Sequence, residues 1–199
     1  MPKPSEHTDP TPIGQRITWL RHPDALTVVV SQEIAPRTFA AIAAWYGCWW
    51  LAGAGMAYGW WIAATPEEGL FLAVCLAFWS FFAVRIGKVL LWRKIGSERI
   101  RVRAGELTYK RAWGTQGRAL VCALDDVTRL EVVPRNPRKF LDVLDVEPWI
   151  IGGESLHLRY RGRTVPFGMQ LPDREARALA AVLDRAIGEF RASGAATNP

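Results

Sequence analysis

Residues 38–92 form a strongly apolar block, and this block limits the possible folds of the chain more than any other feature. Its first part, residues 38–64, contains no charged side chain. A helix over this part would be about 40 Å long at 1.5 Å per residue, which exceeds the roughly 30 Å hydrocarbon core of a bilayer. We therefore predict a first transmembrane helix over residues 38–64, with some tilt or overhang.

A second apolar run follows the break "TPEEG" at residues 65–69, which is predicted to be a periplasmic turn. The run is uncharged over residues 70–84 and then meets Arg85 and Lys88. A cation at the bilayer centre costs about 3 kcal/mol on insertion scales, so these two residues belong near the interface. Residues 69–92 are predicted to form a second transmembrane helix and a basic stem. The alternative is a hairpin buried in a soluble domain, where two adjacent uncharged segments of this length are rare.

Charged residues on either side of the block predict its orientation. The connecting turn carries two glutamates and neither lysine nor arginine, whereas both flanks contain arginine. By the positive-inside rule, we expect both termini in the cytoplasm and the turn outside, with the chain in a bacterial inner (cytoplasmic) membrane.

The rest of the chain is predicted to be a small β-rich cytoplasmic domain. In "ERIRVRAGELTYKRAWG" the apolar Ile100 and Val102 alternate with arginines, which is typical of a half-buried strand. The stretch "LPDREARALAAVLDRAIGEF" carries an apolar stripe at helical spacing and predicts a helix that closes the sheet. Residues 16–33 are expected to add a β-hairpin. Residues 1–15 and 192–199 are expected to be disordered tails, and the insertion 134–153 has no assigned structure.

Two stretches carry a resemblance to a known family: "GELTYKRAWGTQGRALVCALDDVTRLEVV" and "LHLRYRGRTVPFGMQLPDREARALAAVL". With these strands, one C-terminal helix and a two-span anchor, the chain resembles the bacterial PH-like-domain membrane proteins over about residues 96–190. The resemblance implies a membrane α-helical hairpin of two transmembrane helices plus an α+β cytoplasmic domain over residues 96–191. That domain would be a PH-like antiparallel sheet, or partly open barrel, with one C-terminal amphipathic helix. Some such proteins resemble accessory or assembly factors of membrane complexes, including photosynthetic ones.

The stretch "AWYGCWWLAGAGMAYGWW", residues 44–61, holds five of the ten tryptophans. In a membrane helix, Trp60 and Trp61 would lie in an interfacial aromatic belt, as would Trp92 after the second helix. The small residues between the tryptophans suit the close approach of another helix, with Gly55 and Gly59 forming a GxxxG motif. A purely lipid-facing role is the alternative. The predicted helix-packing residues are Gly53, Gly55, Ala57 and Gly59, and the predicted intramembrane aromatic contacts are Trp45, Trp49, Trp50, Phe78, Trp79 and Phe82.

The sequence contains no motif for catalysis, metal binding or cofactor binding. The three histidines, His7, His22 and His157, lie outside the apolar block, so a haem or chlorophyll pocket there would lack its commonest axial ligand. The three cysteines match no metal-ligand spacing. We therefore expect no cofactor, no metal and no enzymatic activity.

A formal net charge of +6 suggests an anionic partner. Ten cations are predicted to contact the membrane surface or a partner, the alternative being a solvated face that only sets the topology. We do not expect nucleic acid, because the charge lies next to the apolar block and no base-stacking platform accompanies it. The ten are Arg85, Lys88, Arg93, Lys94, Arg99, Arg101, Arg103, Arg135, Arg138 and Lys139.

Two functions fit this pattern. The first is a non-catalytic accessory, assembly or scaffold subunit of a larger inner-membrane complex, photosynthetic or respiratory. It would pack through its helices and contact a partner or the membrane surface through the basic domain. The second is an independent membrane-anchored PH-like module that senses lipids or peptides. The expected partners are the lipid bilayer, other membrane-complex subunits and anionic lipid headgroups.

Overall fold

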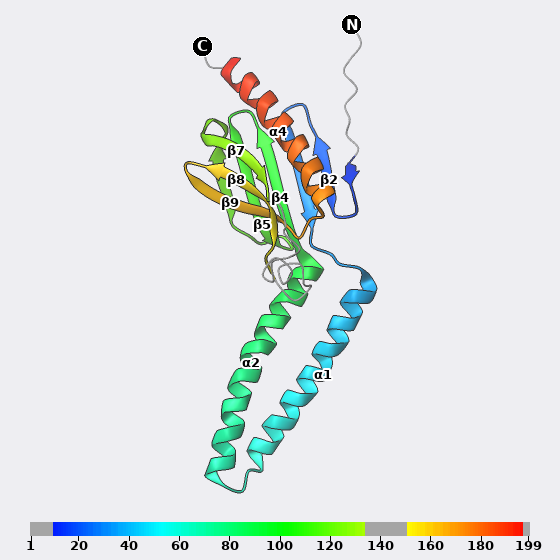
Figure 1. The fold of residues 1–199 in the computed structure, drawn as a ribbon, viewed down its shortest axis with the longest axis vertical. Coiled ribbons are helices and arrows are strands. Elements are labelled where there is room, and N and C mark those ends of the chain that lie inside the picture. Colours follow the sequence, from blue (N-terminus) through cyan, green and yellow to red (C-terminus); the bar gives the residue numbers. More distant parts are fainter. Residues whose placement is uncertain (1–9, 134–150, 197–199) are drawn as a thin grey trace. The chain divides into compact units, whose positions relative to one another are not determined.

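The computed structural model describes residues 10–133 and 151–196, which form two compact units (Figure 1). The helical unit comprises residues 34–94. The β unit comprises the described residues on both sides of it, 10–33, 95–133 and 151–196. The helical unit is therefore an insertion into the chain of the β unit.

Two antiparallel sheets make up most of the β unit. The larger sheet has six strands in chain order and the smaller has three, with a 3-10 turn at Leu124–Asp126 leading from one to the other. The larger sheet contains β1 (Thr11–Ile13), β2 (Ile17–Arg21), β3 (Ala25–Ser31), β4 (Gly96–Arg103), β5 (Glu106–Trp113) and β6 (Ala119–Ala123). The smaller contains β7 (Val127–Val132), β8 (Glu154–Tyr160) and β9 (Arg163–Met169).

Strands β3 and β4 are neighbours in the larger sheet although the helical unit separates them in the chain. Their register places Val28 opposite Ile100 and Leu26 opposite Val102, all four of them buried. The alternation expected for this segment is confirmed, because Arg99, Arg101 and Arg103 are exposed between the buried residues of β4. The hairpin of residues 16–33 thus belongs to the same sheet as the strands that follow the insertion.

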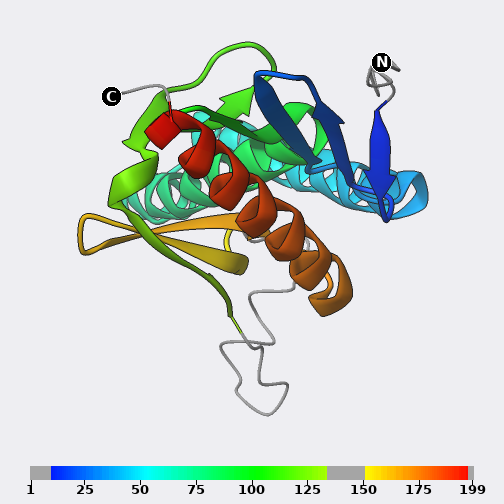
Figure 2. The same ribbon diagram turned by 90° about the horizontal axis from the view of Figure 1, so that it is seen from above.

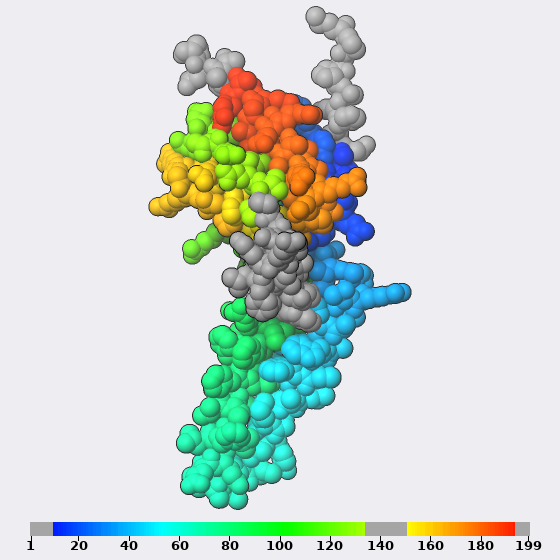
Figure 3. All heavy atoms as spheres, in the orientation of Figure 1, coloured from blue at the N-terminus to red at the C-terminus, as the bar shows by residue number. Residues whose placement is uncertain are grey.

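The C-terminal helix α4 (Asp173–Ala196) lies against both sheets (Figures 1 and 2). Its orange and red atoms cover part of this side of the β unit in Figure 3, beside the green and yellow atoms of the strands. Asp173 and Glu175 lie in its first turn, where carboxylates interact favourably with the helix dipole. The predicted apolar stripe is confirmed and joins the core residues of the strands. Its buried members are Ala176, Leu179, Ala180, Leu183, Ile187 and Phe190.

The helical unit consists of two long helices, α1 (Pro36–Trp61) and α2 (Pro66–Ile95), which lie side by side in Figure 1. Pro66 opens α2, and Glu67 and Glu68 occupy its first turn. The Thr65 hydroxyl accepts a hydrogen bond from the Glu68 amide at 3.3 Å, which satisfies one of the free amides of the first turn. The connection expected over residues 65–69 therefore lies earlier, because most of that stretch is the start of the helix.

The predicted fold class, with two transmembrane helices, is wrong. Within the described residues, α2 alone is long and apolar enough to cross a membrane. Helix α1 has no charge after Arg37, but it consists mainly of tryptophan, tyrosine, glycine and alanine rather than leucine, isoleucine and valine. Indole and phenol groups carry a polar N–H or O–H, which lowers their hydropathy. The prediction took the absence of charge for high hydropathy.

Other expected boundaries differ from the observed elements. Strand β1 lies inside the segment 1–15, for which a tail was expected, and α4 continues to Ala196, beyond residue 191. The two sheets and the C-terminal helix are loosely compatible with a PH-like domain. Most of the insertion 134–153, with Arg135, Arg138 and Lys139, lies outside the described residues.

Candidate functional site

One contact between α1 and α2 is made by the indole of Trp79. Its Nε1 donates a hydrogen bond to the carbonyl oxygen of Trp49 at 2.9 Å, and its ring meets that of Trp50 edge-on, with centroids 5.0 Å apart. The ring lies directly over Gly53, where an added Cβ would stand 2.2 Å from Trp79 Cε2. Only glycine fits at residue 53 while Trp79 keeps this position. We call these four residues the tryptophan seam.

A second contact lies one to two turns away from the seam. The hydroxyl of Tyr46 donates to the carbonyl oxygen of Ala83 at 2.8 Å. A Cβ at Gly87 would lie 2.8 Å from the same hydroxyl oxygen, so Gly87 leaves room for it. The predicted packing residues did not include Tyr46, Ala83 or Gly87. The small residues near the end of the second apolar run were the signal that could have identified two of them.

The predicted packing glycines of α1 have different surroundings. Gly53 is buried in the seam, and a Cβ at Gly59 would lie 3.5 Å from Leu72 Cδ1, an ordinary contact. Gly55 has open space around it, and Ala57 is exposed. The GxxxG pair therefore lies outside the tryptophan seam, and Gly55 lies on the surface of the helical unit.

The predicted aromatic residues are also divided between the seam and the surface. Trp45 lies beside the seam, with its ring centroid 5.6 Å from that of Trp49. Phe78 and Phe82 are exposed and do not point into the helix contact. Of the expected belt residues, Trp60 and Trp61 are exposed. Trp92, by contrast, is completely buried.

A large apolar surface surrounds the helical unit. Most of the exposed large hydrophobic residues of the described chain belong to α1 and α2 rather than to the β unit. Trp61 is 82% exposed, Leu51 74% and Phe71 67%, and only 6% of the most apolar 18-residue window of α2 is buried. Soluble monomers rarely expose contiguous apolar surface on this scale, which marks contact with lipid or with another protein.

The predicted cations occupy three kinds of position. Arg85, Lys88 and Lys94 are exposed on α2, whereas Arg93 is only 2% exposed and offers no free surface charge. The others within the described residues lie on the β unit. There Arg99, Arg101 and Arg103 share the outer face of β4, and the β5 residue Lys110 lies directly opposite Arg99. We call Arg99, Arg101, Arg103 and Lys110 the basic face.

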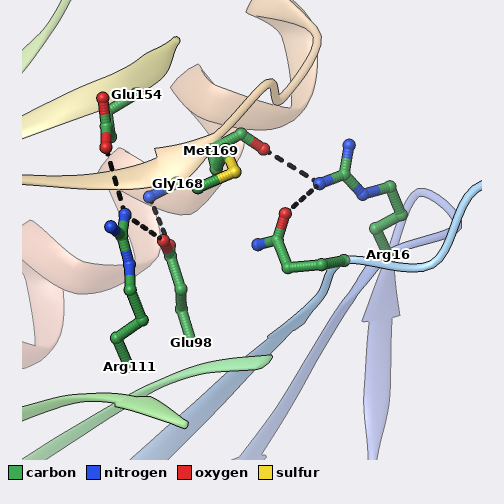
Figure 4. Close-up of polar contacts among 7 residues, drawn as sticks. Arg16, Glu98, Arg111, Glu154, Gly168 and Met169 are labelled. Carbon is green, nitrogen blue, oxygen red and sulfur yellow. Dashed lines mark hydrogen bonds and ion pairs between the residues drawn. The ribbon is translucent and has the colours of Figure 1, made fainter. Parts of the chain in front are cut away.

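A buried carboxylate joins the two sheets (Figure 4). Glu98 of β4 is fully buried and lies 3.1 Å from the Arg111 guanidinium, which also reaches Glu154 of β8 at 3.1 Å. The second oxygen of Glu98 accepts a hydrogen bond from the amide of Gly168 at 2.6 Å. Burial, and next the Glu98 charge, raise the pKa of the nearby Tyr109 phenol above its usual value. This network fixes the relative position of the two sheets.

Arg16 forms the second link between the sheets (Figure 4). Its guanidinium donates to the carbonyl oxygens of Met169, the last residue of β9, and Gln170 at 2.9 and 3.0 Å. It also donates to the Ser31 carbonyl and to Oε1 of buried Gln32, both at 3.0 Å. Gln170 has a φ of +50°, which is uncommon for a residue other than glycine, and Arg16 helps to hold this turn.

The core of the β unit leaves little room for a ligand. One cavity there has a volume of about 10 Å³, room for about one water molecule. Its lining is almost entirely apolar. The lining residues are Ile100, Leu107, Tyr109, Leu130, Leu158, Val165, Phe167, Leu183 and Ile187. Within the described residues, no group of three or more histidine, cysteine, aspartate or glutamate side chains is placed to hold a metal ion.

Cys122 should be unreactive toward thiol reagents in the folded chain. Its side chain is fully buried in the core, and burial raises the pKa of its thiol, so the reactive thiolate is suppressed. We expect N-ethylmaleimide at mildly alkaline pH to leave Cys122 unmodified until denaturant is added, as read by peptide mass spectrometry. Rapid modification of Cys122 in the native chain would show that β6 does not pack as described.

No family model, curated protein or solved structure matches the chain. The functional inference therefore depends on the surfaces described above: the apolar surface of the helical unit and the basic face of the β unit.

Proposed function

We propose that the protein is a non-catalytic, membrane-associated accessory or assembly subunit of a larger protein complex in a bacterial inner membrane. The exposed apolar surface of the helical unit is the observation that carries this proposal. In water, that surface would be a strong liability for aggregation. Lipid, or the apolar helices of partner subunits, would cover this surface and remove that liability.

Helix α2 supplies the candidate membrane span. Its first turn holds Glu67 and Glu68, and its last turn holds Arg93 and Lys94. Since cationic ends face the cytoplasm, this asymmetry supports a cytoplasmic C-terminal end for α2 and a cytoplasmic β unit.

The surface of α1 supports contact with partner subunits rather than simple anchoring. Its exposed side chains alternate between very small ones and large indoles, such as Gly55 beside open space and Trp61 at 82% exposure. Small residues let a second helix approach closely, and large ones then fill the space beside it. An anchor that contacts only lipid does not require this mixture of very small and very large side chains.

Phe78→Arg should weaken membrane association. Phe78 is 66% exposed near the middle of α2, and the new guanidinium would cost about 3 kcal/mol at the bilayer centre, roughly a hundredfold in partitioning. The measurement is the fraction of chain that stays with membranes after alkaline carbonate washing.

Two controls accompany this variant. Phe78→Leu keeps an apolar side chain at the same place and should behave like the parent chain. Leu120→Arg adds the same charge to an exposed residue of β6, where it should have no effect on retention. Equal retention of Phe78→Arg and Phe78→Leu would contradict the proposal that α2 lies in lipid.

A further inference from the structure

The basic face is a regular array of four cations. Side chains two residues apart on a strand point to the same side, about 6.6 Å apart, so Arg99, Arg101 and Arg103 form a row roughly 13 Å long. All three are exposed, and Lys110 extends the charge sideways onto β5. The array is therefore a charged surface rather than a set of scattered residues.

Within the described chain, the array has one favourable cross-strand neighbour, because Arg103 lies directly opposite Glu106. None of the four cations forms an ion pair with a described residue, although Lys110 donates to the Thr115 carbonyl at 3.1 Å. Arg111 and Arg161, by contrast, are paired with carboxylates. Arg99 and Lys110 are directly opposite like charges, an arrangement that destabilises a sheet.

The outer face of the larger sheet is otherwise short, polar or aliphatic. Helix α4 packs on the opposite face of the sheet, so α4 does not cover the cations. Among the described strand residues, the face holds no aromatic side chain and therefore offers no platform on which bases could stack. Its one carboxylate, Glu106, accepts a hydrogen bond from the Thr108 hydroxyl at 2.7 Å. The neighbours on β2, β3, β5 and β6 are Thr18, Leu20, Thr27, Val29, Thr108, Ala119 and Val121.

We propose that the basic face binds the anionic headgroup surface of the lipid bilayer and holds the β unit against it. The inference rests on the proposed membrane association, because a chain anchored by its apolar helix meets headgroups at high effective concentration. An open, flat array of cations without pockets or stacking groups is complementary to a plane of mobile phosphates. Each cation near an anionic leaflet strengthens binding about fivefold, so three together contribute on the order of a hundredfold.

The test measures, in the full chain, whether the basic face lies close to lipid headgroups. A cysteine-free background is made by replacing Cys48, Cys75 and Cys122, and Thr27→Cys then carries a fluorophore beside Arg101. The labelled chain is placed in nanodiscs of phosphatidylcholine, with or without phosphatidylglycerol, that contain a headgroup-attached quencher. We expect quenching in the anionic discs, weak quenching in the neutral discs, and loss of quenching in high salt.

Matched variants separate the basic face from net charge. Arg99→Gln, Arg101→Gln and Arg103→Gln together should lower the ratio of docked to free β unit by on the order of a hundredfold. The control removes the same charge from exposed residues of α4, by Arg174→Gln, Arg177→Gln and Arg185→Gln, and should keep most of the quenching.

Three results would overturn the inference. The first is equal quenching in neutral and anionic discs. The second is an equal loss of quenching in both triple variants. The third is a fluorophore that responds to oligothymidylate or polyglutamate in neutral discs but not to phosphatidylglycerol. Failure of the chain to enter discs contradicts the proposed function instead. The same probe is then read with vesicles of the two compositions, and the headgroup inference stands only if phosphatidylglycerol is required.

Discussion

Gly53→Leu should disrupt the helical unit, whereas Gly55→Leu, two residues away, should leave it intact. A side chain at residue 53 begins 2.2 Å from the Trp79 ring, so the indole must move and lose its hydrogen bond to Trp49. Overpacking costs about 1–3 kcal/mol, and the lost bond adds roughly 1 kcal/mol. A Cβ at residue 55 has no atom within 4 Å, so a leucine there starts in open space.

The measurement for this pair is thermal unfolding in detergent micelles, followed by near-ultraviolet circular dichroism. The edge-on pair of Trp50 and Trp79 contributes to that signal, which should weaken in Gly53→Leu before any heating. Trp79→Phe keeps an aromatic ring but removes the N–H donor, so it should show a smaller loss, near 1 kcal/mol. Similar midpoints for the two glycine variants would mean that the tryptophan seam does not hold α1 to α2.

The same pair of variants also separates helix packing from partner binding. Gly55 lies on the surface of the helical unit, where a partner helix could approach it. We therefore expect Gly55→Leu to keep the folded helical unit but to reduce the amount of partner protein that co-purifies with the chain. Unchanged co-purification would show that Gly55 does not contribute to partner binding.

Glu98→Ala should destabilise the β unit by about 1–3 kcal/mol, the range found when a buried polar group loses its hydrogen-bond partner. The variant takes one carboxylate from Arg111 and leaves the Gly168 amide without its acceptor inside the protein. Because Glu98 is fully buried, water does not replace the lost contacts. Urea unfolding monitored by circular dichroism measures the change.

Two further substitutions show whether burial is the cause. Glu98→Gln retains an acceptor for the Gly168 amide and should cost less than Glu98→Ala. Glu131→Ala removes a carboxylate that pairs with Arg129 and Arg159 at 3.3 and 3.7 Å, in a surface position. Exposed pairs contribute less than about 1 kcal/mol. Equal losses for Glu98→Ala and Glu131→Ala would contradict a special role for the buried network.

The parts of the fold that depend on local periodicity could be predicted from the sequence. The apolar stripe of α4 and the alternation around Ile100 and Val102 in β4 each mark the buried face of a single helix or strand. Glu98 shares the phase of those buried residues, and Arg111 shares the phase of Leu107 and Tyr109. The same alternation could therefore have placed both charges inside, where they must pair.

Contacts between elements could not be read in this way. The GxxxG spacing of Gly55 and Gly59 marks a face of α1 but does not say which neighbour meets it. Of these α1 glycines and Gly53, only Gly53 has no room for a Cβ. The number of spans was mistaken because an uncharged helix of tryptophan and glycine is much less apolar than one of leucine and valine. For the basic face, the sequence shows the charges, and the sheet register shows that Lys110 joins them.

The most direct test of the proposed function is the state of the chain in its own membrane. Membranes are solubilised in a mild detergent and run on a native gel, and the proteins that migrate with the chain are identified by mass spectrometry. We expect the chain in the membrane fraction, in a band far larger than its own 22.3 kDa and together with the subunits of one complex. Recovery of the chain from the soluble fraction, or its migration alone or as a small homo-oligomer, would contradict the role of accessory subunit.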